Sequence, residues 1–259
     1  MSFADGGISS LKTLDGNPLA CGGQPSYRHC YEYDPARMEW IDGPSLIDPR
    51  SSAPSAELRS SSLYWVASGA NNGGRTSSEF FANGAFVEGP AIPEAVTTGW
   101  PCAAALSVDS AVLAGQYAIV FNFTAGTQDV IDQPMLFPSV QSMCGMATKS
   151  DGRRLFVVAG GNLGNAVDDR TQVYDFAAGK WRLAGELPFP LRMGATVTLG
   201  ETFFIVGGRK GLTNTSSSDR LIQFDPDSET WVVRAERLKV ERQSYAFAAF
   251  VNERDYECV

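Results

Sequence analysis

The sequence has one histidine and few cysteines, and both shortages exclude classes of metal site. The five cysteines lie far apart with no CxxC spacing: Cys21, Cys30, Cys102, Cys144 and Cys258. This pattern predicts neither a zinc site nor a disulfide framework, so we expect reduced thiols. The single histidine, His29, is expected in a surface loop and cannot supply a multi-histidine centre. We therefore expect no metal and no cofactor.

The chain also lacks long apolar runs and a basic surface. No run approaches the roughly eighteen apolar residues of a membrane span, and the opening "MSFADGGISS" lacks the cationic start and apolar core of a secretory signal. A cytoplasmic location is the expectation, so the sequons at Asn122 and Asn214 are not expected to be glycosylated. The formal net charge of -8 disfavours nucleic-acid or membrane partners, because both require basic surfaces.

Helical periodicity is missing as well. No segment sustains apolar spacings of three and four, so little helix is expected. What is present are short apolar, β-branched and aromatic runs bounded by turn residues, such as "LFVVA" and "FFIVG". The segment "TQVYDF" alternates apolar and polar residues as a half-buried strand does. These features predict an all-β fold.

The strands belong to a repeat that ends its second apolar run in glycine. These glycines recur 46, 46, 46 and 47 residues apart, at Gly23, Gly69, Gly115, Gly161 and Gly208. Three units carry a full pair, Gly22-Gly23, Gly160-Gly161 and Gly207-Gly208, whereas Ser68 and Ala114 replace the first glycine in units two and three. Glycine permits positive φ and close backbone approach, so a sharp turn is expected there.

An aromatic residue follows each glycine, at Tyr33, Phe81, Phe123, Tyr174 and Phe224. In four units a further apolar residue follows seven positions later, at Trp40, Val130, Trp181 and Trp231, and in the shorter second unit Phe86 follows Phe81. We expect these aromatics to be structural and to pack between successive units, where truncation to alanine would cost about 3–5 kcal/mol.

The order Gly-Gly, Tyr-Asp, Trp, Pro-Arg resembles the kelch repeat. This resemblance implies a kelch-type β-propeller of four-stranded blades, with five full repeats and a C-terminal half-blade. Residues 1–10 are then a short N-terminal segment, 11–251 the propeller, and 252–259 a C-terminal tail or part of the closing blade. Two closures are open: a five-bladed ring in which "SYAFAAFV" pairs with the first unit, which we favour, and a six-bladed ring with a thin last blade.

Two local patterns have simpler explanations than a ligand site. "GGNLGN", residues 160–165, follows a strand but precedes no helix, so it does not predict a nucleotide loop. Cys102 and Cys144 occupy the same phase of neighbouring units. We expect both to pack as small residues in the innermost strands.

Kelch propellers are used as binding modules or as enzymes, and the binding use is our main expectation. Variable polar loops favour a non-catalytic protein–protein interaction module for a protein or peptide partner, acting as an adaptor or scaffold. The expected binding residues are Arg50, Arg192, Arg242, Arg75, Arg209 and Asn162. The first three recur in phase and could grip an acidic peptide, although the same recurrence is typical of inter-blade hydrogen bonds. Kelch adaptors carry an N-terminal oligomerisation domain that this sequence lacks, so three alternatives are open: a bare propeller, a fragment, or a protein to which the adaptor analogy does not apply.

The alternative is an enzyme. Galactose oxidase, whose propeller is similar, uses copper held by tyrosines and histidines, which one histidine cannot supply. Bacterial sialic-acid mutarotases also resemble kelch propellers and need only carboxylate and arginine groups at the mouth of the ring. No paired carboxylates recur at the expected inner-strand positions, which contain alanine, serine, cysteine and glycine. The sequence therefore predicts that the chain is not an enzyme.

Overall fold

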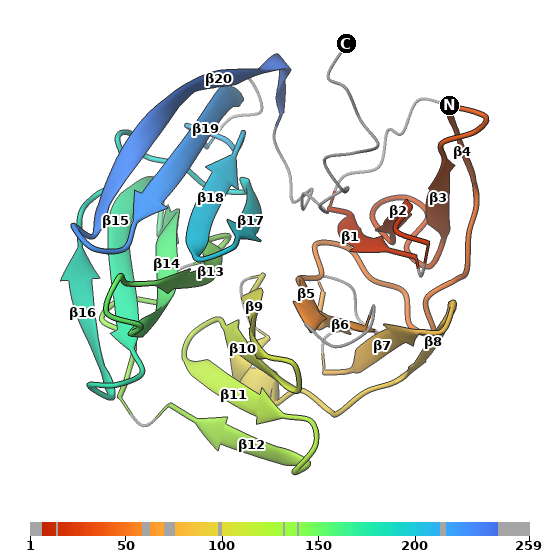
Figure 1. Cartoon of the computed structure of the whole chain (residues 1–259), viewed down its shortest axis with the longest axis horizontal. Helices are drawn as coiled ribbons and strands as arrows, with labels where there is room; N and C mark the ends of the chain where they lie inside the picture. The colour runs from red at the N-terminus through yellow and green to blue at the C-terminus, as the bar shows by residue number, and fades with distance from the viewer. Residues whose placement is uncertain are drawn as a thin grey trace.

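Five antiparallel four-stranded blades form a ring, as the repeat predicts (Figure 1). The computed structural model describes residues 7–13, 15–58, 63–69, 76–97, 100–131, 133–138, 140–212 and 216–242. Helix in this part of the chain is limited to one 3₁₀ turn, Glu94–Val96. No helix among these residues is long and apolar enough to cross a membrane.

Each blade contributes its strands in chain order, from the axis outward. Blade 1 contains β1 (Ser9–Lys12), β2 (Pro18–Cys21), β3 (Cys30–Asp34) and β4 (Glu39–Asp42). Blade 2 contains β5 (Ser55–Leu58), β6 (Leu63–Ala67), β7 (Ser78–Ala82) and β8 (Ala85–Glu88). Blade 3 contains β9 (Cys102–Ser107), β10 (Ser110–Ala114), β11 (Ala118–Asn122) and β12 (Thr127–Val130). Blade 4 contains β13 (Met143–Thr148), β14 (Arg154–Leu163), β15 (Ala166–Asp175) and β16 (Lys180–Ala184). Blade 5 contains β17 (Ala195–Leu199), β18 (Thr202–Val206), β19 (Ser218–Asp225) and β20 (Thr230–Arg242).

The glycine pairs have positive φ: Gly22-Gly23 and Gly207-Gly208 follow the ends of β2 and β18, whereas Gly160-Gly161 form a register shift within β14. Gly22 and Gly160 have φ of 71° and 61°, and a Cβ there would lie 2.6 Å from the carbonyl oxygen of Arg50 and 2.1 Å from that of Leu191. Both carbonyls belong to the connection that enters the next blade. Glycine is therefore needed for its backbone conformation and for the close approach of that connection.

The aromatic residues of the repeat pair across the two outer strands. Tyr174 lies opposite Trp181, and Phe224 opposite Trp231. Trp231 also donates a hydrogen bond from Nε1 to Thr171 Oγ1 of the preceding blade at 2.9 Å. In blade 3, Phe123 lies beyond the end of β11, and Phe121 occupies the position of the strand that Tyr174 holds in blade 4. The even spacing of the glycines concealed this shift of two residues.

Contacts between in-phase residues show that the innermost strands run in the same direction along the axis. Lys12 and Glu57, near the ends of β1 and β5, form an ion pair. Cys102 and Cys144, near the starts of β9 and β13, form a disulfide. The ring therefore has one end where these strands begin and another where they finish.

The expectation of reduced thiols is wrong for four of the five cysteines. Cys21 and Cys30 lie opposite each other in β2 and β3 and are disulfide-bonded. The Cys102–Cys144 disulfide joins blades 3 and 4. Sequence spacing gave no warning, because the ring brings residues 42 positions apart side by side. The expected closing strand "SYAFAAFV", the tail 252–259 and Cys258 lie outside the described residues.

Candidate active site

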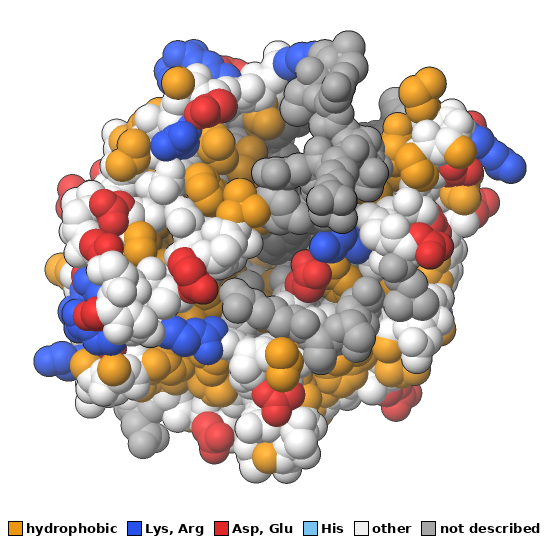
Figure 2. Space-filling model, viewed as in Figure 1, with side chains coloured by type: hydrophobic (Ala, Val, Ile, Leu, Met, Phe, Trp, Pro, Cys, Tyr) orange, Lys and Arg blue, Asp and Glu red, His pale blue; other side chains and the backbone are white. Residues whose placement is uncertain are grey.

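A central channel of about 520 Å³ lies between the innermost strands of all five blades. Its wall is largely built of small side chains, as the sequence predicts, because inner strands that converge on the axis leave little room. The polar and ionisable side chains of the wall are fewer: Ser10, Lys12, Ser55, Glu57, Tyr64, Thr196, Thr198 and Glu201. Figure 2 shows basic and acidic side chains next to one another near the middle of one face of the ring.

An ion pair joins blades 1 and 2 in the channel wall. Lys12 Nζ lies 3.2 Å from Glu57 Oε1, and the two side chains are 20% and 49% exposed. Ser55 Oγ, two residues before Glu57, donates a hydrogen bond to the carbonyl oxygen of Ser10 at 3.0 Å, which fixes the two strands beside each other. The pair is accessible from the channel and also anchored to the scaffold.

Tyr64 lies directly opposite Glu57 in the β5–β6 ladder, so both side chains are on the same face of blade 2. Tyr64 is 3% exposed, and its Oη is buried beside the Glu57 carboxylate. Burial, together with the nearby Glu57 carboxylate, raises the pKa of Tyr64 well above its usual value. The phenol is therefore a neutral hydrogen-bond donor at physiological pH.

A second carboxylate, Glu201, stands in the turn after β17 and lines the same channel. It also borders an adjoining hollow of about 370 Å³, whose lining includes Arg154, Thr148 and Ser107. The two spaces share Met146, Thr198, Gly200 and Glu201, so they are contiguous. A carboxylate and a guanidinium thus border one end of the channel.

This arrangement can perform acid–base chemistry on a small polar molecule. Glu57 and Glu201 line a common cavity from different blades, and an ammonium and a neutral phenol adjoin the first of them. Two carboxyl groups in one cavity can accept a proton at one point of a substrate and deliver a proton at another.

The expected binding residue Arg50 lies in the seam between blades 1 and 2. Its side chain is 0% exposed, and Nε donates to Glu79 Oε1 at 2.8 Å. Nη1 donates to the carbonyl oxygens of Ser68 and Ser77 at 2.7 and 2.9 Å. The guanidinium is enclosed by the scaffold, in the inter-blade arrangement that the sequence left open.

Arg192 occupies the same phase before β17 and is 6% exposed. Its Nη1 donates to Gln141 Oε1 at 2.6 Å, and Nη2 to the carbonyl oxygen of Leu212 at 2.9 Å. Asn162 Nδ2 also donates to Gln141 Oε1, and Arg209 Nη2 also donates to the Leu212 carbonyl. The structure brings these three expected residues together: Arg192 precedes β17, Asn162 lies near the end of β14, and Arg209 follows β18.

Arg75 and the side chain of Arg242 lie outside the described residues. The binding role assigned to this set of residues stays a prediction. Arg50 and Arg192 precede the innermost strands, whereas Lys12, Glu57 and Glu201 lie at or beyond the ends of those strands. Arg50 and Arg192 are therefore at the opposite end of the ring from the acid–base groups.

Lys12, Glu57, Tyr64 and Glu201 were not predicted as site residues from the sequence. Catalytic carboxylates were expected at equivalent positions of the units, whereas Glu57 lies in a strand of blade 2 and Glu201 in a turn of blade 5. The available signal was a charged residue at the end of an innermost strand, because the innermost strands of a propeller lie around its axis.

Comparisons with known proteins show the fold but no close relative. No family model matches the chain, and no curated protein matches it in sequence. Among solved structures, YjhT is similar with a TM-score of 0.70 and 11% identity over 89% of this chain and 84% of that chain. A fungal alcohol oxidase of the AA5 family, in complex with copper, is similar with a TM-score of 0.66 and 14% identity over 93% of this chain. The chain spans 55% of that oxidase. The propeller is of the kelch, or galactose oxidase central-domain, type.

These neighbours contradict the expectation of a non-catalytic interaction module. The AA5 neighbour is an alcohol oxidase, and nothing in the comparisons points to an adaptor. The expectation failed for a physical reason. The inner strands were expected to carry no catalytic groups because their residues are small. Charged groups of opposite sign nevertheless line the channel, at non-equivalent positions of different blades.

The copper of the oxidase neighbour does not fit the residues of this chain. Across the described ranges, no group of three or more His, Cys, Asp or Glu side chains could hold a metal ion. His29 Nε2 lies 3.1 Å from Asp42 Oδ1, and neither residue lines the channel. We derive no step through copper.

Proposed function

We propose that this protein is a sugar-active enzyme of the mutarotase type, which interconverts the anomers of a small acidic sugar in its central channel. The comparisons favour this alternative from the sequence over an adaptor. The observation that carries the proposal is the presence of Glu57 and Glu201 in one cavity, with Lys12 paired to the first. The mutarotase resemblance implies carboxylate and arginine groups: Glu57 and Glu201 line the channel, and Arg154 borders the adjoining hollow.

The reaction needs proton transfer at two oxygens and no redox partner. Glu57 takes the proton of the anomeric hydroxyl, the exocyclic C–O becomes C=O, and the ring C–O bond breaks. The electron pair of that bond goes to the ring oxygen, which takes a proton from Glu201 in its protonated form. Rotation about the bond to the carbonyl carbon exposes the other face. Closure by the reverse transfers then gives the other anomer and returns both carboxyl groups to their starting states.

The channel suits a molecule of this class. A cavity of about 520 Å³ lies within the size range of small-molecule sites. Hydroxyl groups of Ser10, Ser55, Thr196 and Thr198 line it beside small apolar side chains. Such a wall can hydrogen-bond to sugar hydroxyls without filling the space.

The test is the rate of anomer interconversion of N-acetylneuraminic acid, followed by NMR exchange or polarimetry. The wild-type protein should accelerate it, and Glu57→Gln should lower kcat by about 10²–10⁴, because the amide cannot accept the proton. Glu88→Gln, an exposed change on the outermost strand of the same blade, is the matched control and should leave the rate unchanged. A wild-type rate equal to the buffer rate across a panel of sialic acids would refute the proposal.

The cytoplasmic location expected from the sequence stays a prediction. The two disulfides weigh against it, because such bonds persist in oxidising compartments and are rare where thiols are kept reduced. Assays of this protein should therefore be run without reductant.

A further inference from the structure

One buried aromatic position of the blade carries a hydroxyl group in blade 2 but not in blades 4 and 5. The residue five places before the recurring glycine of the repeat is Tyr64 in blade 2, Phe156 in blade 4 and Phe203 in blade 5. All three rings are at most 3% exposed. The residues opposite them in the innermost strands are Glu57, Met146 and Thr198, respectively. The core therefore accepts phenylalanine at this position, so packing does not require the hydroxyl group of Tyr64.

The Tyr64 hydroxyl instead serves the Glu57 carboxylate. Burial, the charge of Glu57 and a hydrogen bond to that carboxylate all raise the pKa of the Tyr64 phenol, so the phenol keeps its proton and donates it in the hydrogen bond. At 3% exposure the phenol cannot reach a ligand, whereas the Glu57 side chain is 49% exposed in the channel wall. Tyr64 can therefore influence the channel only through Glu57.

Lys12 holds the same carboxylate from blade 1. Its Nζ lies 3.2 Å from Glu57 Oε1, and its side chain is 20% exposed. Strands β9 and β10 also contact β5, and neither contains an acidic or basic side chain. The ionisable groups that face Glu57 from the strands packed against it are thus Lys12 and Tyr64. A carboxylate can accept about four hydrogen bonds, so these two contacts leave it able to accept a proton from a ligand.

We infer that Tyr64 is a positioning residue, whose hydrogen bond holds the Glu57 carboxylate charged and fixed in the channel wall as the proton acceptor of the reaction. The inference rests on the proposed function for the reaction of Glu57, but the contact between the two side chains does not depend on that function. A hydrogen bond to the charged form of a carboxyl group favours that form, and a fixed acceptor needs less reorientation when the substrate arrives.

The first test compares kcat and KM of wild type and Tyr64→Phe across a range of pH, with N-acetylneuraminic acid as the substrate. The variant should fold with a Tm close to that of the wild type, because phenylalanine already fills this position in two blades. Its kcat should fall by about 10- to 100-fold, the usual effect of losing a hydrogen bond to a charged group, and its KM should stay within about twofold. The acid limb of the kcat profile should move to higher pH, because the lost hydrogen bond favoured the charged carboxylate.

The second test observes Glu57 directly and needs no activity. The side-chain carboxyl carbons of glutamate are titrated by NMR, and the Glu57 signal is identified by its loss in Glu57→Gln. In Tyr64→Phe the midpoint of this signal should move up by about one pH unit or more. Tyr33→Phe, which removes a hydroxyl group from an outer strand of blade 1, is the matched control and should leave the midpoint where it is in the wild type.

Equal Glu57 midpoints in wild type and Tyr64→Phe would overturn the inference whatever happens to kcat, because a general disturbance of the fold lowers activity without moving this titration. A moved midpoint with an unchanged kcat would also overturn it, since the contact would then not serve the reaction. Failure of the proposed function looks different. A moved midpoint in a protein that does not accelerate anomer interconversion would leave the contact standing and refute the enzyme.

Discussion

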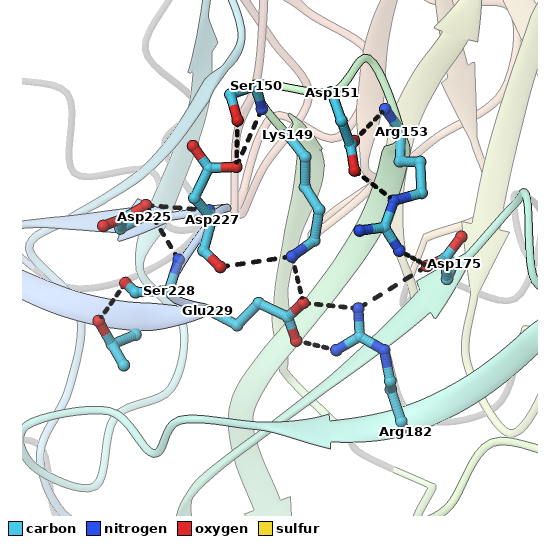
Figure 3. A network of polar contacts seen from close by, with 11 residues as sticks. Lys149, Ser150, Asp151, Arg153, Asp175, Arg182, Asp225, Asp227, Ser228 and Glu229 are labelled. Atoms are coloured by element: carbon cyan, nitrogen blue, oxygen red, sulfur yellow. Dashed lines mark hydrogen bonds and ion pairs between the residues drawn. The ribbon is translucent and has the colours of Figure 1, made fainter.

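Charged groups join blades 1 and 2, and charged groups also join blades 4 and 5. The two seams differ in how deeply these groups are buried. In the first, Arg50 and Glu79 are 0% and 1% exposed, and Glu79 also accepts hydrogen bonds from the backbone N–H groups of Ile47 and Asp48 at 2.7 and 3.0 Å. In the second, shown in Figure 3, charged groups from the turns and outer strands form a wider network. The Arg50–Glu79 contacts of the first seam are buried, so water cannot replace them.

The network of the second seam is more exposed and more redundant. Lys149 Nζ lies 2.7 Å from Glu229 Oε1, and Arg182 also pairs with Glu229 and lies 3.9 Å from Asp175. Asp227 accepts hydrogen bonds from the backbone and side chain of Ser150 at 2.9 and 3.0 Å. Each charged group has a second partner or contact with solvent. Burial, rather than the number of ion pairs, therefore decides how much one of these charges contributes to the free energy of unfolding.

The largest expected effect comes from breaking the buried pair. Glu79→Ala removes the buried countercharge of Arg50 and leaves Arg50 Nε and two backbone N–H groups without their acceptor, so the free energy of unfolding should fall by about 3–5 kcal/mol. Urea denaturation measures this loss. Glu88→Gln, on the exposed strand that pairs with β7, should change stability by less than about 0.5 kcal/mol. A loss below about 1 kcal/mol for Glu79→Ala would mean that the pair is solvated and that the comparison fails.

The seam between blades 3 and 4 is held covalently and should rank second. Replacing both Cys102 and Cys144 by alanine removes a link across 42 residues, and the expected loss is about 2–4 kcal/mol. Thiol titration of the unfolded wild type without reductant should find one free thiol, from Cys258. Five free thiols would show that the bonds do not form, and unaltered stability of the double variant would show that they contribute nothing.

The smallest effect should come from the partly buried network between blades 4 and 5, in which Glu229 is 17% exposed and its cations have further partners. Glu229→Gln should lower the free energy of unfolding by about 1 kcal/mol or less, because solvent and neighbouring carboxylates compensate the remaining cations. The loss should shrink further in high salt, since screening weakens the ion pairs that the substitution removes. Denaturation at low and high salt measures both values. A loss as large as that of Glu79→Ala would erase the distinction between the two seams.

Much of the fold could be predicted from local sequence, because every blade must meet the same structural requirements. A connection must pass close to the end of each second strand, so Gly22 and Gly160 recur in phase, and a large apolar face must be covered, so Trp181 and Trp231 recur with their partners. Blade 3 departs from this rule, and the sequence misplaced Phe123 for that reason. The repeat therefore predicted the positions of the aromatic residues only in blades that keep the common spacing.

The sequence by itself determined an all-β chain of five similar units, because strand period, turn glycines and aromatic pairs are local demands that each unit must meet alone. Only the tertiary structure decided which residues meet at the axis. Closing the ring places Lys12 beside Glu57, Cys102 beside Cys144, and Glu201 on a cavity shared with both blades 1 and 2. Such contacts join different units at positions that do not repeat, so their chemistry depends on distances that spacing along the chain does not contain.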